Sequence, residues 1–192
     1  IVIVKAFRFI NRLKEQGYDK IGVSINISAI QLLNPDFTDR LFELMSEMQI
    51  NSKNVGIEIT ESVFSSNLKK INNVIEKLRN AGLYIAIDDF GTGYSSLARE
   101  NELNVNCLKI DKYFIDRLLD KDINKAITSD IISMAHKLGH CTIAEGVEYE
   151  SQLKYLKEYG CDRIQGYLIS KPLDEDDAIK FLKKYDKSIC CP

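Results

Sequence analysis

Short apolar runs alternate with amphipathic helical segments along the whole chain, and this pattern constrains the fold more than any other feature. The six runs cover residues 22–26, 55–61, 84–89, 107–111, 142–148 and 163–168. Apolar residues at helical spacing predict helices at about 1–16, 36–48, 66–80, 95–101, 123–138, 149–159 and 174–185. Strict alternation of strands and helices is typical of a parallel sheet. We therefore expect an α/β fold built from six β/α units.

Each predicted strand contains or ends in a polar residue. These residues are Asn26, Glu58, Asp88 with Asp89, Lys109, Glu145 and Gln165. In parallel α/β folds, sites form at the carboxyl ends of the strands and take side chains from several strands. The sequence therefore predicts a single site that gathers these side chains.

Asp88 and Asp89 are adjacent where their strand ends. Two neighbouring negative charges are unfavourable unless a cation neutralises them, so the pair indicates a metal site. A helix cap followed by a solvated turn is the alternative interpretation.

Residues 90–93 (FGTG) form a glycine-containing loop without the Lys-Ser/Thr ending of a phosphate-binding P-loop. We expect this loop to be flexible and to lie over the site.

The candidate side chains are mostly oxygen donors, which suit Mg²⁺ or Mn²⁺, whereas zinc sites are expected to use His and Cys. Such a set can hold two ions about 3.5–4 Å apart, which activate a water and clamp phosphate oxygens. Lys109 would add positive charge at the phosphate, and Glu145 could accept a proton from the water. The residues favour metal-assisted hydrolysis of a phosphodiester, although enolases and aldolases also carry carboxylates at the mouth of a barrel.

Length and composition fit one domain, residues 1–192, with 45% hydrophobic and 28% charged residues. The net charge of -2 and the scattered Lys and Arg argue against binding of a nucleic-acid duplex. No apolar run approaches the ~20 residues of a membrane span. The five cysteines lack zinc-ligand spacing, and most are expected to be free buried thiols. A reducing cytoplasm is the location that fits them best.

Seven motifs resemble those of the EAL domain family, occur in the family order and cover nearly the whole chain. They are VSINISA at 23–29, EITE at 58–61, DDFGTGYSSL at 88–97, LKID at 108–111, AEGVE at 144–148, GCD at 160–162 and QGY at 165–167. The resemblance implies a TIM-type (β/α)8 barrel. It also implies hydrolysis of cyclic di-GMP, a bacterial second messenger, to the linear dinucleotide pGpG with Mg²⁺ or Mn²⁺ as cofactor.

Residue by residue, the resemblance implies the members of the active site. Asn26, Glu58, Asp88 and Asp89 match the family's metal ligands. Lys109 is similar to the lysine that contacts the water and the phosphate. Glu145 is similar to the general base or a residue that supports it.

The resemblance also extends to residues around the site. Glu61 matches the glutamate that anchors the loop after the Asp pair and supports dimerisation, and Gln165 matches the glutamine near the site. Asp111 and Glu148 match less central acids, for which a structural role is an equal alternative. A homodimer and an upstream sensor or GGDEF-type domain are the partners that the resemblance implies, besides cyclic di-GMP itself.

The Glu-Ala-Leu tripeptide that names the family is absent from this sequence. In the family it lies on the second barrel strand and its glutamate binds metal, so we expect the first two strands to be missing. The chain also begins without Met, inside an apolar segment, as expected for a piece of a longer protein, which could be tethered to a membrane. We expect open sheet edges at the strands of Asn26 and Gln165, and unpaired edges favour pairing with another chain.

Two other functions remain open from the sequence. The domain could be a catalytically inactive module that binds cyclic di-GMP or another protein, or a fragment without a ligand. The presence of Lys109, Glu145 and both aspartates argues against the inactive module, because binding alone needs neither a base nor a metal pair.

Overall fold

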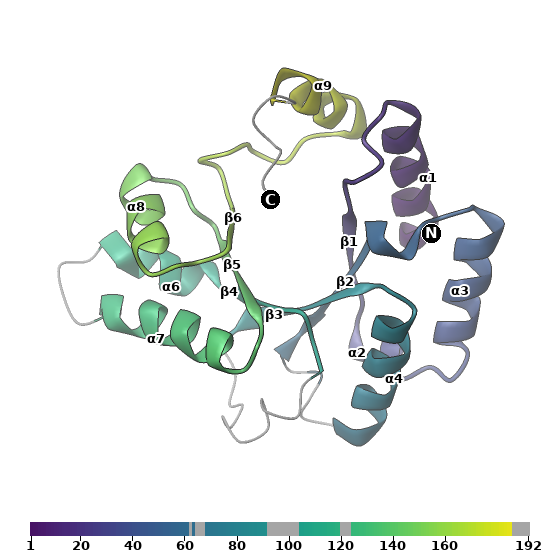
Figure 1. Ribbon diagram of the computed structural model, residues 1–192, viewed down its shortest axis with the longest axis horizontal. Helices are drawn as coiled ribbons and strands as arrows, with labels where there is room; N and C mark the ends of the chain where they lie inside the picture. The colour runs from purple at the N-terminus through teal and green to yellow at the C-terminus, as the bar shows by residue number, and fades with distance from the viewer. Residues whose placement is uncertain (62, 64–67, 92–103, 120–123, 186–192) are drawn as a thin grey trace.

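The computed structural model describes residues 1–61, 63, 68–91, 104–119 and 124–185. Within these residues, six parallel strands form one sheet in the order β1-β2-β3-β4-β5-β6. The sheet curves into an arc with the helices outside it, as in a barrel with one side open (Figure 1). The strands are β1 (Val23–Asn26), β2 (Val55–Thr60), β3 (Tyr84–Phe90), β4 (Cys107–Ile110), β5 (Cys141–Glu145) and β6 (Arg163–Gln165). The predicted parallel α/β architecture is confirmed, with β5 and β6 shorter than expected.

Helices connect the strands and cover the outer face of the sheet (Figure 1). They are α1 (Val2–Glu15), α2 (Ala29–Leu32), α3 (Phe37–Glu47), α4 (Leu68–Asn80), α6 (Lys112–Asp116), α7 (Asn124–Lys137), α8 (Glu150–Glu158) and α9 (Glu175–Tyr185), with 3₁₀ turns η1 (Ser52–Asn54) and η3 (Arg117–Leu119). The helix expected near 95–101 lies outside the described residues. The helices α2 and α6 were not predicted, because one or two turns are too short to show an apolar period.

Side-chain alternation gives the sheet two different faces. Successive residues of a strand point to opposite faces. Ile57, Ile87 and Leu108 are almost fully buried and belong to the hydrophobic core with residues of the outer helices. Their neighbours Glu58, Asp88 and Lys109 therefore point to the concave face. This alternation puts the polar members of all the strands on the inside of the arc.

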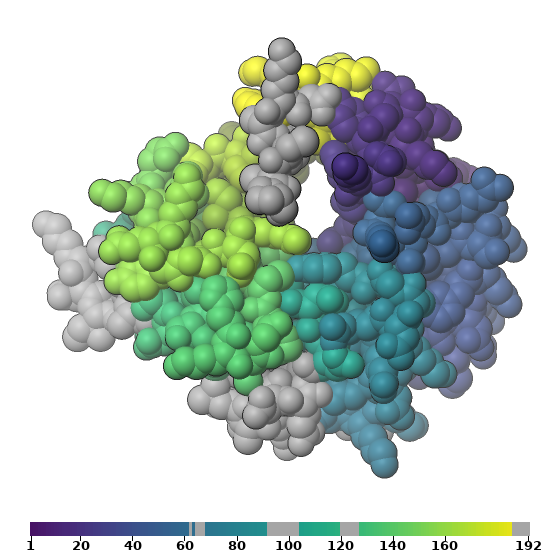
Figure 2. Space-filling view, in the orientation of Figure 1, coloured from purple at the N-terminus to yellow at the C-terminus, as the bar shows by residue number. Residues whose placement is uncertain are grey.

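The open side of the arc lies between β6 and β1. Within the described residues, β1 pairs only with β2 and β6 pairs only with β5, so both outer edges lack a strand partner. Helices α1 and α9 lie next to each other there, and Arg12 forms ion pairs with Glu175 and Asp176, both at 2.5 Å. Figure 2 shows an opening through the molecule beside α1, on this side of the arc. No described helix is long and apolar enough to cross a membrane.

Candidate metal and active site

The ammonium group of Lys109 lies at the centre of a carboxylate cluster. Its Nζ is 2.6 Å from Glu58 Oε2, 3.0 Å from Asp88 Oδ1 and 2.7 Å from Glu145 Oε1. The lysine side chain is only 4% exposed, and those of the three acids are 13–16% exposed. These side chains come from β2, β3, β4 and β5, so the cluster spans the four central strands. The predicted convergence at the carboxyl edge of the sheet is therefore found for this part of the site.

The cluster holds more negative than positive charge, and this changes the proton affinity of its members. Burial alone would lower the pKa of Lys109, but its hydrogen bonds to Glu145, Glu58 and Asp88 raise that pKa above its usual value. Burial raises the pKa of Glu145, an effect that the neighbouring Lys109 opposes. The lysine is therefore charged at neutral pH, and Glu145 holds a proton more readily than an exposed glutamate does.

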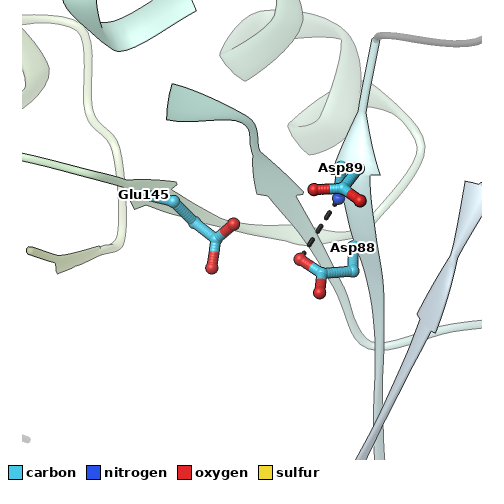
Figure 3. Close-up of side chains that lie close together, drawn as sticks. All are labelled: Asp88, Asp89 and Glu145. Carbon is cyan, nitrogen blue, oxygen red and sulfur yellow. Dashed lines mark hydrogen bonds between the residues drawn. The ribbon is translucent and has the colours of Figure 1, made fainter. Parts of the chain in front are cut away.

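A β-bulge brings Asp88 and Asp89 to the same side of β3. Between Ile87 and Phe90, the register with β4 shifts, and the backbone of Asp89 has a φ of 55°. Adjacent residues of a regular strand point to opposite faces, but a bulge can turn one side chain to the other face. The positive φ of Asp89 lies in the left-handed region of the backbone, which Asp tolerates better than most residues. Figure 3 shows both carboxylates on the side that faces Glu145, and the Asp89 N–H donates to Asp88 Oδ1 at 3.2 Å. Because of the bulge, the carboxylates of Asp88 and Asp89 face the same side and could bind the same metal site.

The donor set fits a hard divalent cation. One carboxylate oxygen from each of Asp88, Asp89 and Glu145 lies within 4.8 Å of the other two. Burial, followed by the charge of Asp88 and then Asp111, raises the pKa of Asp89. A cation between these oxygens would relieve that repulsion, and carboxylates are the ligands that Mg²⁺ and Mn²⁺ prefer.

Asn26 and Gln165 lie at the two edges of the sheet. Asn26 is opposite Glu58 in the β1–β2 register, and Gln165 is opposite Glu145 in the β5–β6 register. Both residues are exposed. The structure therefore places them on either side of the carboxylate cluster, at strand ends that border the open side of the arc.

Glu61 lies at the base of the loop that follows the Asp pair. The residue is 6% exposed, and its Oε2 accepts a hydrogen bond from the Gly91 N–H at 3.0 Å. Gly91 has a φ of 92°, and a Cβ there would lie 2.8 Å from the ring of Phe114. The carboxylate and the ring together determine where the chain leaves β3, although most of the loop, residues 92–103, lies outside the described residues.

Replacement of Glu61 by Ala should weaken this support, while Glu61→Gln keeps an acceptor for the Gly91 N–H. We expect Glu61→Ala to lower the free energy of unfolding by about 1–3 kcal/mol, because a part-buried N–H loses its partner. Urea denaturation of both variants measures this difference. Equal losses in the two variants would show that the hydrogen bond to Gly91 contributes nothing.

Asp111 and Glu148 have contacts outside the carboxylate cluster. The Asp111 side chain accepts from the Tyr113 N–H at 2.9 Å and caps α6. Glu148 accepts from Lys112 Nζ at 2.8 Å, and the same ammonium pairs with Asp116. These contacts favour the structural alternative for both acids.

Gln152 lies near the site and was not predicted from the sequence. It is fully buried, its Oε1 accepts from the N–H groups of Glu148 and Tyr149, and its Nε2 donates to the Ile115 carbonyl. Gln152 therefore links the segment that follows Glu145 to α6. The capping-box position of a glutamine three residues after the N-cap was the available signal in the sequence.

Comparison with known proteins adds to this geometry. Residues 1–172 match the EAL domain family. Cyclic di-GMP phosphodiesterase NbdA of Pseudomonas aeruginosa is 34% identical over 96% of this chain and 24% of its own length. The chain spans only about a fifth to a quarter of the length of such curated relatives.

Solved structures share the architecture. The PaMucR phosphodiesterase in a c-di-GMP complex superposes with a TM-score of 0.86, at 31% identity over 92% of this chain and 71% of that one. Klebsiella pneumoniae BlrP1, in a manganese and cy-diGMP complex, gives a TM-score of 0.77 at 28% identity over 88% of this chain and 43% of that one. Because the family model matches residues 1–172 and the relatives share the six-stranded architecture, the chain belongs to the EAL domain family.

Proposed function

We propose that this domain hydrolyses cyclic di-GMP to linear pGpG with Mg²⁺ or Mn²⁺ as cofactor. The observation that carries the proposal is the buried cluster of Glu58, Asp88 and Glu145 around Lys109, with Asp89 re-aimed toward it by the bulge. A relative named as a cyclic di-GMP phosphodiesterase and the PaMucR complex support the choice of substrate. The manganese complex of BlrP1 supports the choice of cofactor.

Each residue has a role that follows from its place. Asn26, Glu58, Asp88 and Asp89 would hold the metal, which supplies charge for the phosphate oxygens and acidifies a water. Lys109 keeps three carboxylates together and adds positive charge where the phosphate would bind. Glu145 lies beside the same cation position as Asp88 and Asp89. We assign it the role of base rather than of ligand, because a carboxylate with a raised pKa accepts a proton from the attacking water more readily. Gln165 borders the same edge and would contact the substrate.

The proposal also covers the location of the domain, its oligomeric state and the longer protein around it. We propose that residues 1–192 form a single domain that acts in the cytoplasm as a homodimer, with Glu61 supporting the loop and the dimer contact. The small share of the curated relatives that the chain covers supports an upstream sensor or GGDEF-type domain in a longer protein, which could be membrane-tethered. An upstream segment would also supply the family's Glu-Ala-Leu glutamate.

The test is chromatography of pGpG after incubation of the purified chain with cyclic di-GMP and Mn²⁺. Asp88→Asn is the negative variant, since it removes a charge while keeping the acceptor for the Asp89 N–H. We expect turnover by the chain, or by a longer chain that includes the Glu-Ala-Leu segment, and loss of at least about 100-fold in Asp88→Asn. Binding of cyclic di-GMP without turnover by either chain would contradict the proposal and indicate an inactive binding module.

A further inference from the structure

A second cluster of reactive side chains lies at the opposite ends of the same strands. Tyr84, Cys107, Cys141 and Arg163 are the first residues of β3, β4, β5 and β6. Cys141 and Glu145 lie an even number of residues apart on β5, so they share the concave face. The cluster is separate from the carboxylates, which occupy the carboxyl ends, and no step of the proposed hydrolysis uses it.

The two cysteines are placed as a reacting pair. Cys107 and Cys141 are opposite each other in the β4–β5 register, and both are free thiols. Neighbouring strands are about 4.8 Å apart, which is inside the ~4.4–6.8 Å between Cα atoms that a disulfide spans. Cys107 is fully buried, whereas Cys141 is partly exposed. A reagent from solvent therefore reaches Cys141 before Cys107.

The surroundings of Cys141 favour its thiolate. The Tyr84 hydroxyl lies 2.7 Å from Cys141 Sγ, and Arg163 Nη1 donates to that hydroxyl at 3.4 Å. The Cys107 thiol, the Tyr84 hydroxyl and the Arg163 charge lower the pKa of Cys141 to about 6, against the effects of burial and of Asp162. The pKa values of Cys107 and Tyr84 are raised, so both keep their protons where Cys141 is ionised, and the Tyr84 hydroxyl is then the donor to the Cys141 sulfur.

We propose that Cys141 is a peroxide-reactive thiolate and that Cys107 resolves its oxidised form as a disulfide between β4 and β5. The Cys141 sulfur attacks one oxygen of a hydroperoxide, so an S–O bond forms, the O–O bond breaks, and the leaving alkoxide or hydroxide takes a proton. The sulfur is oxidised by two electrons to sulfenic acid and the peroxide is reduced. The Cys107 sulfur then attacks Cys141 and loses its proton, which leaves with the sulfenic hydroxyl as water. This inference goes beyond the proposed hydrolysis and does not depend on it.

Cys161 provides a control within the same chain. It is also a free, partly exposed thiol, but it lies just before β6, where its Sγ donates to the Arg163 carbonyl at 3.2 Å. Burial raises the pKa of Cys161. Trypsin would place Cys107, Cys141 and Cys161 on separate peptides, 100–109, 138–154 and 158–163, so each thiol can be followed alone.

The first measurement is the rate of iodoacetamide alkylation of each peptide between pH 5 and 9. We expect the rate at Cys141 to level off with a midpoint near pH 6, while the rate at Cys161 keeps rising through pH 9. Tyr84→Phe keeps the ring and removes the hydroxyl, so the Cys141 midpoint should move to higher pH. A Cys141 rate that rises through pH 9 as at Cys161 would overturn the proposal.

The second measurement is treatment of the reduced chain with one equivalent of hydrogen peroxide, followed by mass spectrometry without reductant. We expect a disulfide that joins peptides 100–109 and 138–154, and its loss in Cys141→Ser but not in Cys161→Ser. In Cys107→Ser, dimedone should label the sulfenic acid on peptide 138–154. Oxidation at other cysteines while Cys107 and Cys141 stay reduced would contradict the inference.

Discussion

Replacement of Lys109 by Met should reduce the proposed hydrolysis of cyclic di-GMP by about 10²–10³-fold, because it removes the positive charge that the proposal assigns to the phosphate. It should also lower the free energy of unfolding by about 3–5 kcal/mol at pH 8. The substitution keeps a long side chain but leaves Glu58, Asp88 and Glu145 without the cation that each contacts within 3.0 Å. Urea denaturation and product chromatography measure the two effects.

Lys112→Met is the matched control for this experiment. Lys112 also pairs with two carboxylates, those of Asp116 and Glu148, but its side chain is 46% exposed. Ion pairs of this kind contribute about 0–1 kcal/mol, so the control should be nearly as stable as the unmodified chain. If Lys109→Met were no less stable than Lys112→Met, the lysine would not hold the carboxylates together.

Outside the carboxylate cluster, a single methyl group at position 166 should lower the stability of the fold more than any other change. A Cβ on Gly166 would lie 2.2 Å from the Val147 carbonyl oxygen and 2.3 Å from its nitrogen, both backbone atoms. The hydrogen bonds Val147 N–H to the Gln165 carbonyl and Leu168 N–H to the Val147 carbonyl flank this contact. We expect Gly166→Ala to lower the free energy of unfolding by about 3 kcal/mol, because neither backbone can move without breaking them.

The control for Gly166→Ala is Gly22→Ala just before β1. A Cβ there meets the Asn54 carbonyl oxygen at 3.4 Å, which is ordinary contact. The urea midpoint of Gly22→Ala should stay close to that of the unmodified chain, while the midpoint of Gly166→Ala falls. An unchanged midpoint in Gly166→Ala would show that β6 is not packed against the segment after β5 as described.

The strand arrangement and the centre of the site could be predicted from the sequence, because a parallel sheet restricts where the ends of its strands lie. Once the apolar runs are read as parallel strands, the residues that end them must meet at one edge. Glu58, Asp88, Lys109 and Glu145 meet there for this reason. Side-chain alternation then predicts that they share the concave face.

Other features depend on contacts between residues far apart in the chain, which a local pattern does not contain. The bulge at Asp88 and Asp89 comes from a change of register between β3 and β4. The need for glycine at 166 comes from the backbone of residue 147. The expectation that the cysteines beside the strands are buried was wrong for Cys141, the first residue of β5, and for Cys161, just before β6, because both are partly exposed.

Calorimetric titration of the purified chain with Mn²⁺, beside the Asp88→Asn variant, tests whether the carboxylate cluster is a metal site. We expect the chain to bind the cation through this cluster and Asp88→Asn to weaken binding at least about tenfold, because a charged ligand is lost. Circular dichroism of the variant checks that its fold is kept. Equal Mn²⁺ affinity in the two proteins, or no binding by the unmodified chain, would contradict the assignment of these carboxylates as a metal site.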